Sequence, residues 1–251
     1  MTLKSQIIVK DNTTQMIAAG ADIFKMASHD CVKQKGHFVV AVSGGSTPRP
    51  MHRLLTEEPY YSEIPWDKTD IFWVDERCVP ENDPASNFGA AKIDLINKIP
   101  IPADQIHPMP GDLSPEKGAL TYEREMKDYF QLTEGEYPVF DLIYLGLGND
   151  GHTASLFPGH QALDETKRLV VTVKGGDPHV SRLTLTFPVI NHAKQIVFMV
   201  SGKGKSPVLK TIFKNSKDLL PAQRVRPCQG KMTWLLDKEA ASMLSRDMIH
   251  A

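Results

Sequence analysis

The chain has 251 residues, 41% of them hydrophobic, and its 29 basic and 30 acidic side chains leave a net charge of -1. This length supports one substantial core or at most two small ones, and we expect a single domain over residues 1–251. A nucleic-acid-binding protein usually has a basic excess, and a membrane span needs a long apolar run, so we expect neither partner. The N-terminus lacks the features of a signal peptide, and three widely spaced cysteines indicate reduced thiols, which predicts a cytoplasmic protein.

Short apolar runs alternate with longer amphipathic stretches along the chain. We predict strands at residues 37–43, 70–74, 141–147, 169–173 and 195–200, and helices at 13–34, 48–55, 86–97, 114–132, 206–213 and 238–248. Strands buried on both faces and separated by helices predict an α/β fold, with a mainly parallel sheet flanked by helices on both faces. Ligands of such sheets bind beyond the carboxyl ends of the strands, which selects the loops after Val42, Val74, Leu147 and Val200.

The first of these loops reads Ser43-Gly44-Gly45-Ser46-Thr47 and runs into Pro48. Two glycines allow backbone N–H groups to turn toward an anion, two hydroxyls add donors, and the proline can open a helix. The pattern therefore indicates a phosphate site, with an ordinary strand-to-helix turn as the alternative. No Lys-Ser or Lys-Thr pair follows the glycines, so this is not a Walker A loop.

The second loop places Asp75, Glu76 and Arg77 directly after an apolar strand and continues to Ser86-Asn87. These residues suit hydroxyl recognition, base chemistry or an anion clamp, and the alternative is a solvated cluster of salt bridges.

The third loop has the spacing Gly146-x-Gly148-x-x-Gly151, which formally matches a dinucleotide fingerprint. Pro158-Gly159 interrupts the segment too early for the long helix of a Rossmann unit, so we reject that interpretation. What remains is His152 two residues from Asp150, and an imidazole suits proton removal from water near neutral pH. The alternative is a structural histidine.

The fourth loop carries Lys203 and Lys205 at a predicted strand end, where either lysine can bind a phosphate. Arg182 opens an alternating run and is a candidate second cation, or else a surface arginine on an edge strand. His152 and His160 lie in a segment that Pro and Gly interrupt, and the cysteines are scattered, so we expect no metal and no cofactor.

Five segments, in this order along the chain, resemble the 6-phosphogluconolactonase family: SGGSTP, DERCVP followed by SN, LGLGNDGHTASLFPG, RLTLTFPVIN and SGKGK. That family belongs to a larger group that includes the glucosamine-6-phosphate deaminases. The resemblance extends over nearly the whole chain. It implies a sugar-phosphate isomerase-like α/β fold, Rossmann-like but without a dinucleotide, and hydrolysis of 6-phospho-D-glucono-1,5-lactone to 6-phosphogluconate in the pentose phosphate pathway.

Carried over residue by residue, the resemblance implies that His152 is the catalytic base and that Asp150 is its neighbour. It implies that phosphate is held by Ser43, Gly44, Gly45, Ser46, Thr47, Arg182 and Lys205, the last matching the family's lysine better than Lys203 does. The sugar-binding side would be lined by Asp75, Arg77 and Asn87. The expected partner is a phosphorylated sugar lactone, and the expected assembly is a monomer or a small homo-oligomer.

Two other functions stay open. A glucosamine-6-phosphate deaminase would share the phosphate loop, Asp75 and the Asp-Gly-His turn, but that family has a glutamate five residues after the histidine, where this chain has Phe157. It also typically has Asp-Glu-Tyr where this chain has Asp-Glu-Arg, and both departures favour the lactonase. A sugar-phosphate sensor without catalysis would need an output segment, for which the length leaves little room.

Overall fold

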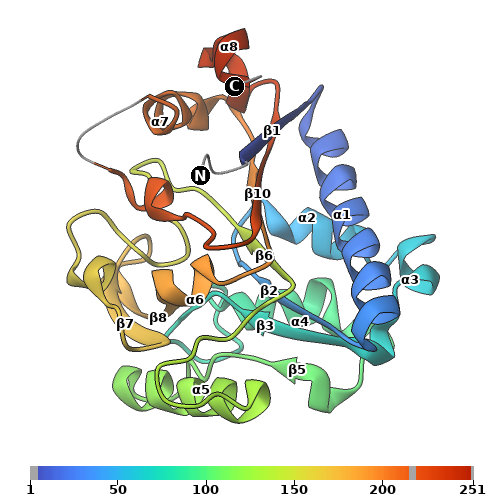
Figure 1. The fold of residues 1–251 in the computed structure, drawn as a ribbon, viewed down its shortest axis with the longest axis vertical. Helices are drawn as coiled ribbons and strands as arrows, with labels where there is room; N and C mark the ends of the chain where they lie inside the picture. Colours follow the sequence, from blue (N-terminus) through green and yellow to red (C-terminus); the bar gives the residue numbers. More distant parts are fainter. Residues whose placement is uncertain (1–4, 215–218, 250–251) are drawn as a thin grey trace.

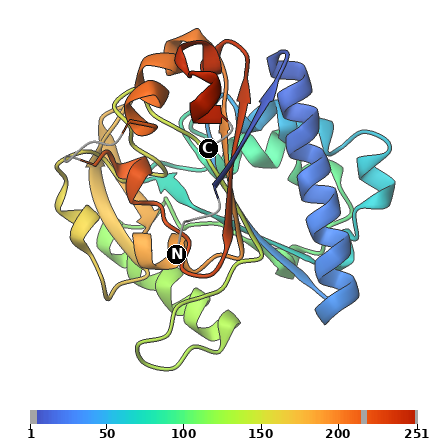
Figure 2. The same ribbon diagram turned by 45° about the horizontal axis from the view of Figure 1, so that its top comes forward.

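The computed structural model describes residues 5–214 and 219–249 and contains two sheets with helices around them (Figures 1 and 2). The larger sheet has seven strands, and every neighbouring pair in it is parallel. In spatial order they are β1 (Ser5–Lys10), β10 (Lys231–Asp237), β9 (Gln195–Val200), β6 (Leu142–Leu145), β2 (Phe38–Val42), β3 (Thr69–Trp73) and β5 (Ile106–His107). The parallel sheet predicted from the sequence is confirmed, although the strands at its β1 edge, β1 and β10, were not predicted.

A smaller antiparallel sheet has the order β4-β8-β7, with β4 at Asp75–Arg77, β8 at Val180–Leu185 and β7 at Val170–Gly175. The expectation that residues 169–173 belong to the parallel sheet is therefore wrong. Only residues 176–179 separate β7 from β8, and a connection this short can form a hairpin but not the long crossover that parallel neighbours need.

The helices are α1 (Thr13–Lys35), α2 (Pro48–Leu54), α3 (Tyr60–Glu63), α4 (Asn87–Asp94), α5 (Pro115–Phe130), α6 (Phe187–Asn191), α7 (Ser206–Ile212) and α8 (Arg246–Ile249). In the described ranges, no helix combines the length and apolar character needed to cross a membrane. The single helix expected at residues 238–248 is wrong. The Asp237 carboxylate accepts hydrogen bonds from the amides of Ala240 (2.8 Å) and Gly202 (3.1 Å), which starts a short 3-10 turn. Extended backbone at Leu244 then separates this turn from α8.

Helices cover both faces of the large sheet. Trp73 of β3 contacts Phe88 of α4, with ring centroids 5.1 Å apart, whereas its neighbour Phe72 contacts Tyr129 of α5, also at 5.1 Å. Successive side chains of a strand point to opposite faces, so α4 and α5 lie on opposite sides of the sheet.

The order of the strands reverses between β2 and β6. From β2 the chain proceeds outward through β3 to β5, and from β6 it proceeds outward in the other direction through β9 to β10. Open α/β sheets bind ligands outside the carboxyl ends of the strands at such a switch point. The loops that follow Val42 and Leu145 flank this point.

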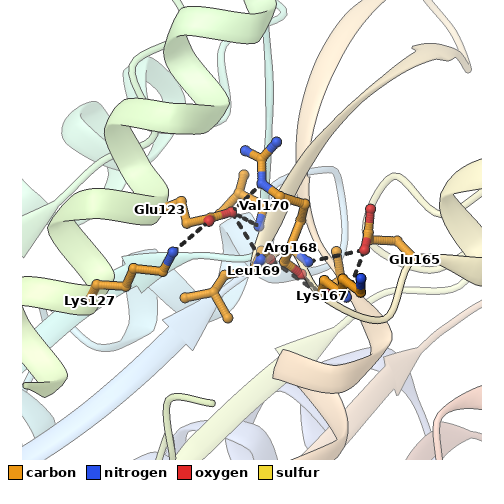
Figure 3. A network of polar contacts seen from close by, with 8 residues as sticks. Glu123, Lys127, Glu165, Lys167, Arg168, Leu169 and Val170 are labelled. Atoms are coloured by element: carbon orange, nitrogen blue, oxygen red, sulfur yellow. Dashed lines mark hydrogen bonds and ion pairs between the residues drawn. The ribbon is translucent and has the colours of Figure 1, made fainter. Parts of the chain in front are cut away.

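Glu123 of α5 attaches the small sheet to the rest of the molecule (Figure 3). Its carboxylate accepts hydrogen bonds from Arg168 Nε (2.7 Å), the Leu169 amide (3.0 Å) and Lys127 Nζ (2.9 Å). Burial works to raise the pKa of Glu123, but the hydrogen bonds from Lys127 and Arg168 outweigh it and lower that pKa. The start of β7 is thereby fixed on α5.

Asp141 directly precedes β6 and so lies at the amino ends of the parallel strands, opposite the end where the switch point is. It joins the segments that contain Lys35, Val39 and Lys194. Its side chain is fully buried and accepts hydrogen bonds from the Val39 amide (2.9 Å) and Lys194 Nζ (3.0 Å), with Lys35 Nζ at 2.8 Å. We expect Asp141→Asn to lower the free energy of unfolding by about 3 kcal/mol, because an amide cannot accept from all of these donors and leaves buried groups unpaired. Urea denaturation measures this change.

Asp164→Asn is the matched control, because the Asp164 carboxylate pairs with Arg224 at 3.0 Å but its side chain is 81% exposed. Exposed ion pairs contribute about 1 kcal/mol or less. Equal losses for the two variants would contradict a structural role for Asp141.

Candidate active site

A pocket of about 330 Å³ lies at the carboxyl ends of the strands, at the switch point. The residues that line it come from all four strand-end loops selected from the sequence and from β8. Among the predicted site residues these are Ser43, Gly44, Gly45, Ser46, Thr47, Asp75, Arg77, Asn87, His152, Arg182 and Lys205. Asp150 does not line the pocket but contacts His152. The structure thus brings the predicted residues together around one pocket.

His152 and Asp150 form a hydrogen-bonded pair. Nδ1 of the ring lies 2.6 Å from Oδ1 of the carboxylate, which also accepts from the His152 amide at 3.1 Å. Burial works to raise the pKa of Asp150, but the hydrogen bonds and charge of His152 outweigh it and lower that pKa. An ionised carboxylate can only accept, so Nδ1 carries the proton and the lone pair of the neutral ring is on Nε2.

Gly148 gives the imidazole room to fold back onto its own loop. A Cβ atom at this position would lie 2.1 Å from His152 Nδ1 and 2.6 Å from Asp150 Oδ1. No larger residue fits without displacing the pair. The Gly148 amide also donates to the His152 carbonyl at 2.8 Å, which closes the loop.

Two arginines are neighbours on adjacent strands of the small sheet, where Arg77 of β4 is paired with Arg182 of β8. Arg182 is buried, and its guanidinium donates to the carbonyls of Gly175 (2.9 Å) and Pro178 (3.1 Å). Burial and then repulsion from Arg77 lower the pKa of Arg182. Like charges directly opposite one another destabilise a sheet, so a bound anion would relieve the repulsion. The alternative of a surface arginine on an edge strand is wrong, since β8 is the central strand.

Asn87 ties the acidic loop to the glycine loop. Its side chain donates to the Asp75 carbonyl (2.9 Å) and accepts from Arg77 Nη1 (2.6 Å). A Cβ on Gly44 would lie 1.8 Å from the Asn87 side-chain oxygen, so only glycine allows this contact. Asp75 is further held by Ser155, whose hydroxyl donates to Oδ2 at 2.6 Å. These contacts fix this side of the pocket before any ligand binds.

All five residues of the glycine loop, 43–47, line the pocket. The Ser43 hydroxyl donates to the Tyr144 carbonyl at 2.8 Å and so links the loop after β2 to strand β6 at the switch point. Gly45 has a φ of +98°, a conformation that L side chains rarely adopt. The following helix, α2, has only seven residues, and the Thr47 side chain does not cap it. The dipole of so short a helix adds little, so an anion here depends on amides and on the nearby cations.

Of the two candidate lysines, Lys205 lines the pocket and Lys203 is exposed outside it. Burial lowers the pKa of Lys205, and the charge of Asp150 partly offsets this effect. Within residues 5–214 and 219–249, the Lys205 ammonium has no hydrogen-bond or ion-pair partner, which leaves it free for a ligand.

This pocket differs from a larger cavity of about 720 Å³ beside α5 in whether its cationic side chains are paired with carboxylates. In that cavity Lys127 and Arg168 both pair with Glu123. In the site pocket, by contrast, neither Arg77 nor Arg182 has a carboxylate within ion-pairing distance in the described part of the chain. Unpaired cations, and not volume, mark the pocket as an anion site.

The described residues define the arrangement of candidate metal ligands and of the Gly-rich loop after β6. In the part of the chain that the structure describes, no three His, Cys, Asp or Glu side chains are grouped to hold a metal ion. The Gly146-x-Gly148-x-x-Gly151 loop leads into a turn, and the next helical segment is the 3-10 helix at Gln161–Asp164. A pyrophosphate therefore has no helix N-terminus at this loop.

Several residues of the site were not predicted. Asn149 and Ala154 line the pocket, and Ala154 has a φ of +48°, which is uncommon for a residue with a side chain. Glu76 belongs to the same predicted loop but was not among the predicted site residues; it accepts from the amides of Asn87 and Phe88 (both 2.7 Å) and caps the start of α4. Only the position of Glu76 one residue before Arg77 linked it to the site, and a strand alternates its side chains.

The fold and the pocket define an α/β protein whose strand-end pocket is lined by two arginines without a carboxylate partner in the described ranges and by a histidine. Residues 11–234 match the family model described as glucosamine-6-phosphate isomerases/6-phosphogluconolactonase. A 6-phosphogluconolactonase from Nostoc sp. is 38% identical over 97% of this chain and 100% of its own, and one from Synechocystis sp. is 43% identical over 85% and 87%. The solved structure of the 6-phosphogluconolactonase from Trypanosoma brucei superposes with a TM-score of 0.88 at 30% identity, covering 97% of this chain and 100% of that one.

The chain therefore belongs to the glucosamine-6-phosphate isomerase/6-phosphogluconolactonase family.

Proposed function

We propose that this protein is a lactone hydrolase that converts 6-phospho-D-glucono-1,5-lactone to 6-phosphogluconate in the pentose phosphate pathway. One observation carries the proposal from the structure: Arg77 and Arg182, which have no carboxylate partner in the described residues, line the same pocket as His152, and Asp150 hydrogen-bonds to this histidine. A phosphorylated ester needs both an anion site and a base for water. The names of the relatives support this substrate.

The first chemical step is proton removal from water by His152. Asp150 accepts a hydrogen bond from His152 Nδ1–H, so the proton stays on Nδ1 and the lone pair of Nε2 is available as the acceptor. As the water oxygen bonds to the lactone carbonyl carbon, its proton moves to Nε2. The carbonyl electrons move onto oxygen, and Asp150 stabilises the imidazolium that forms.

The second step breaks the bond between the carbonyl carbon and the ring oxygen. The oxyanion electrons re-form the carbonyl, and His152 returns its proton to the departing oxygen, which becomes a hydroxyl. Arg77 and the backbone amides of the glycine-bearing loops are both placed along the pocket to donate to the oxyanion. The product is a carboxylic acid, which ionises at neutral pH.

Arg182, Lys205 and the loop at residues 43–47 hold the phosphate in this proposal. A phosphate bound away from the carbonyl orients the lactone, so binding energy from a non-reacting group serves the chemical step. The Asp75 and Asn87 side chains, already fixed by mutual hydrogen bonds, face the sugar hydroxyls.

The family also includes glucosamine-6-phosphate isomerases, so that activity is the alternative to test. Phe157 stands where the deaminases have a glutamate, and its ring centroid lies 4.7 Å from that of His152. A phenyl ring cannot polarise the imidazole for ring opening, so we expect no ammonia release from glucosamine 6-phosphate.

The deciding experiment measures the rate of lactone opening with and without the protein. These lactones open spontaneously in water, so the protein-free rate must be subtracted. We expect turnover well above that background, in proportion to protein concentration. Calorimetric binding of 6-phosphogluconate without any acceleration would instead indicate a sensor and contradict the proposal.

A further inference from the structure

The side chain of Phe157 contacts both His152 and Arg182, two residues that line the pocket. Its ring centroid is 4.7 Å from that of His152, with the planes tilted by 53°, and the Arg182 guanidinium lies 5.7 Å from the same ring. Phe157 is therefore in contact with the candidate base and with a candidate phosphate ligand at once. The ring is half-buried, although it belongs to an irregular segment after β6.

The end of the β7–β8 hairpin packs against this ring at Gly175 and Gly176. A Cβ atom on Gly175 would lie 3.2 Å from Phe157 Cδ2, and one on Gly176 would lie 3.0 Å from Phe157 Cζ. Arg182 donates to carbonyls of the same hairpin, at Gly175 and Pro178. The ring thus has little freedom to move in response to a change on either side.

We propose that Phe157 is a positioning residue that sets the separation between the His152 imidazole and the Arg182 guanidinium. This inference rests on the proposed function, because the separation matters only for a substrate that reaches both groups. A phosphorylated lactone bound by Arg182 presents its carbonyl at a fixed distance from the phosphate. If the ring that contacts both groups is lost, the base no longer meets that carbonyl in reactive geometry.

The first test compares Phe157→Ala and Phe157→Leu with the wild type. We expect kcat for the phosphorylated lactone to fall about 10–100-fold in the alanine variant, and less in the leucine variant, which retains part of the volume. An unphosphorylated gluconolactone is not anchored at Arg182 and can adjust to a displaced imidazole. The advantage of the phosphorylated substrate in kcat should therefore shrink, and a role in stability alone would leave that ratio unchanged.

The second test alters the position of the Phe157 ring without changing any residue that lines the pocket, by a substitution at Gly175. Gly175→Ala adds a Cβ that must displace the Phe157 ring by a few tenths of an ångström. We expect a loss in kcat of about three- to tenfold in the wild-type background and none in the Phe157→Ala background. Such non-additivity is expected only if the Phe157 ring transmits the effect of the Gly175 substitution to His152.

Phe130→Leu is the control for simple loss of aromatic packing, since Phe130 is half-buried at the end of α5 among Phe72, Tyr129 and Phe140. We expect it to lower stability and leave kcat unchanged. If the wild type hydrolyses the lactone but the Phe157 variants keep the substrate ratio, or the Gly175 effect is additive, the inference is wrong. If the wild type itself is inactive, it is the proposed function that fails.

Discussion

Replacing His152 with alanine is expected to lower kcat for hydrolysis of the phosphorylated lactone by about 10²–10⁴-fold, the usual contribution of a general base. KM should change little, because the cations proposed to hold the phosphate make no hydrogen bond or ion pair with the imidazole in the described residues. Asp150 makes the effect specific to this histidine, since its carboxylate orients the ring and leaves Nε2 as the acceptor. Initial rates at several substrate concentrations, corrected for spontaneous opening, measure both constants.

His29→Ala provides the matched control, because His29 is exposed on α1, away from the residues that line the pocket. It should retain the wild-type kcat. Added imidazole should restore part of the activity of the His152→Ala variant, since removal of the side chain opens space over Gly148. A blank with imidazole and no protein is needed. Near-normal turnover by His152→Ala would remove the assignment of this residue as the base.

The location of the pocket followed from a simple rule about parallel sheets. Short apolar runs identified β2, β3, β6 and β9, and the carboxyl ends of parallel strands meet at one edge, so their loops were expected together. The structure places Gly45, Arg77, His152 and Lys205 around one pocket. Local sequence was sufficient here because burial on both faces leaves a clear apolar signal.

Long-range pairing left no comparable signal. The cross-strand pair of Arg77 and Arg182 depends on antiparallel register between segments more than 100 positions apart, which no local pattern encodes. The contact between Phe157 and His152 likewise depends on the path of an irregular loop. β1 and β10 were also missed, although each has a short apolar run. The last helix was overpredicted because helical propensity does not register the tight turn fixed by the Asp237 carboxylate.

The three predicted cations, Arg77, Arg182 and Lys205, differ in how far their side chains also hold the fold together. Arg182 is 4% exposed and donates to three backbone carbonyls, so replacing it would disturb the hairpin as well as the pocket. Arg77 similarly holds Ala85 and Asn87. The Lys205 ammonium makes no hydrogen bond or ion pair in the described residues. Replacing Lys205 should therefore change ligand binding without disturbing the fold.

Lys205→Ala is expected to raise KM for the phosphorylated lactone about 10–100-fold, the effect of losing a hydrogen bond to a charged group. The kinetic constants for unphosphorylated gluconolactone should stay unchanged, because that substrate has no phosphate to lose contact with. Lys203→Ala is the matched control: the same residue type, two positions away in the same loop, but exposed outside the pocket. It should change KM by less than about twofold. Equal effects of Lys205→Ala on both substrates would show that this lysine does not bind the phosphate, and a large effect of Lys203→Ala in its place would transfer the role to that residue.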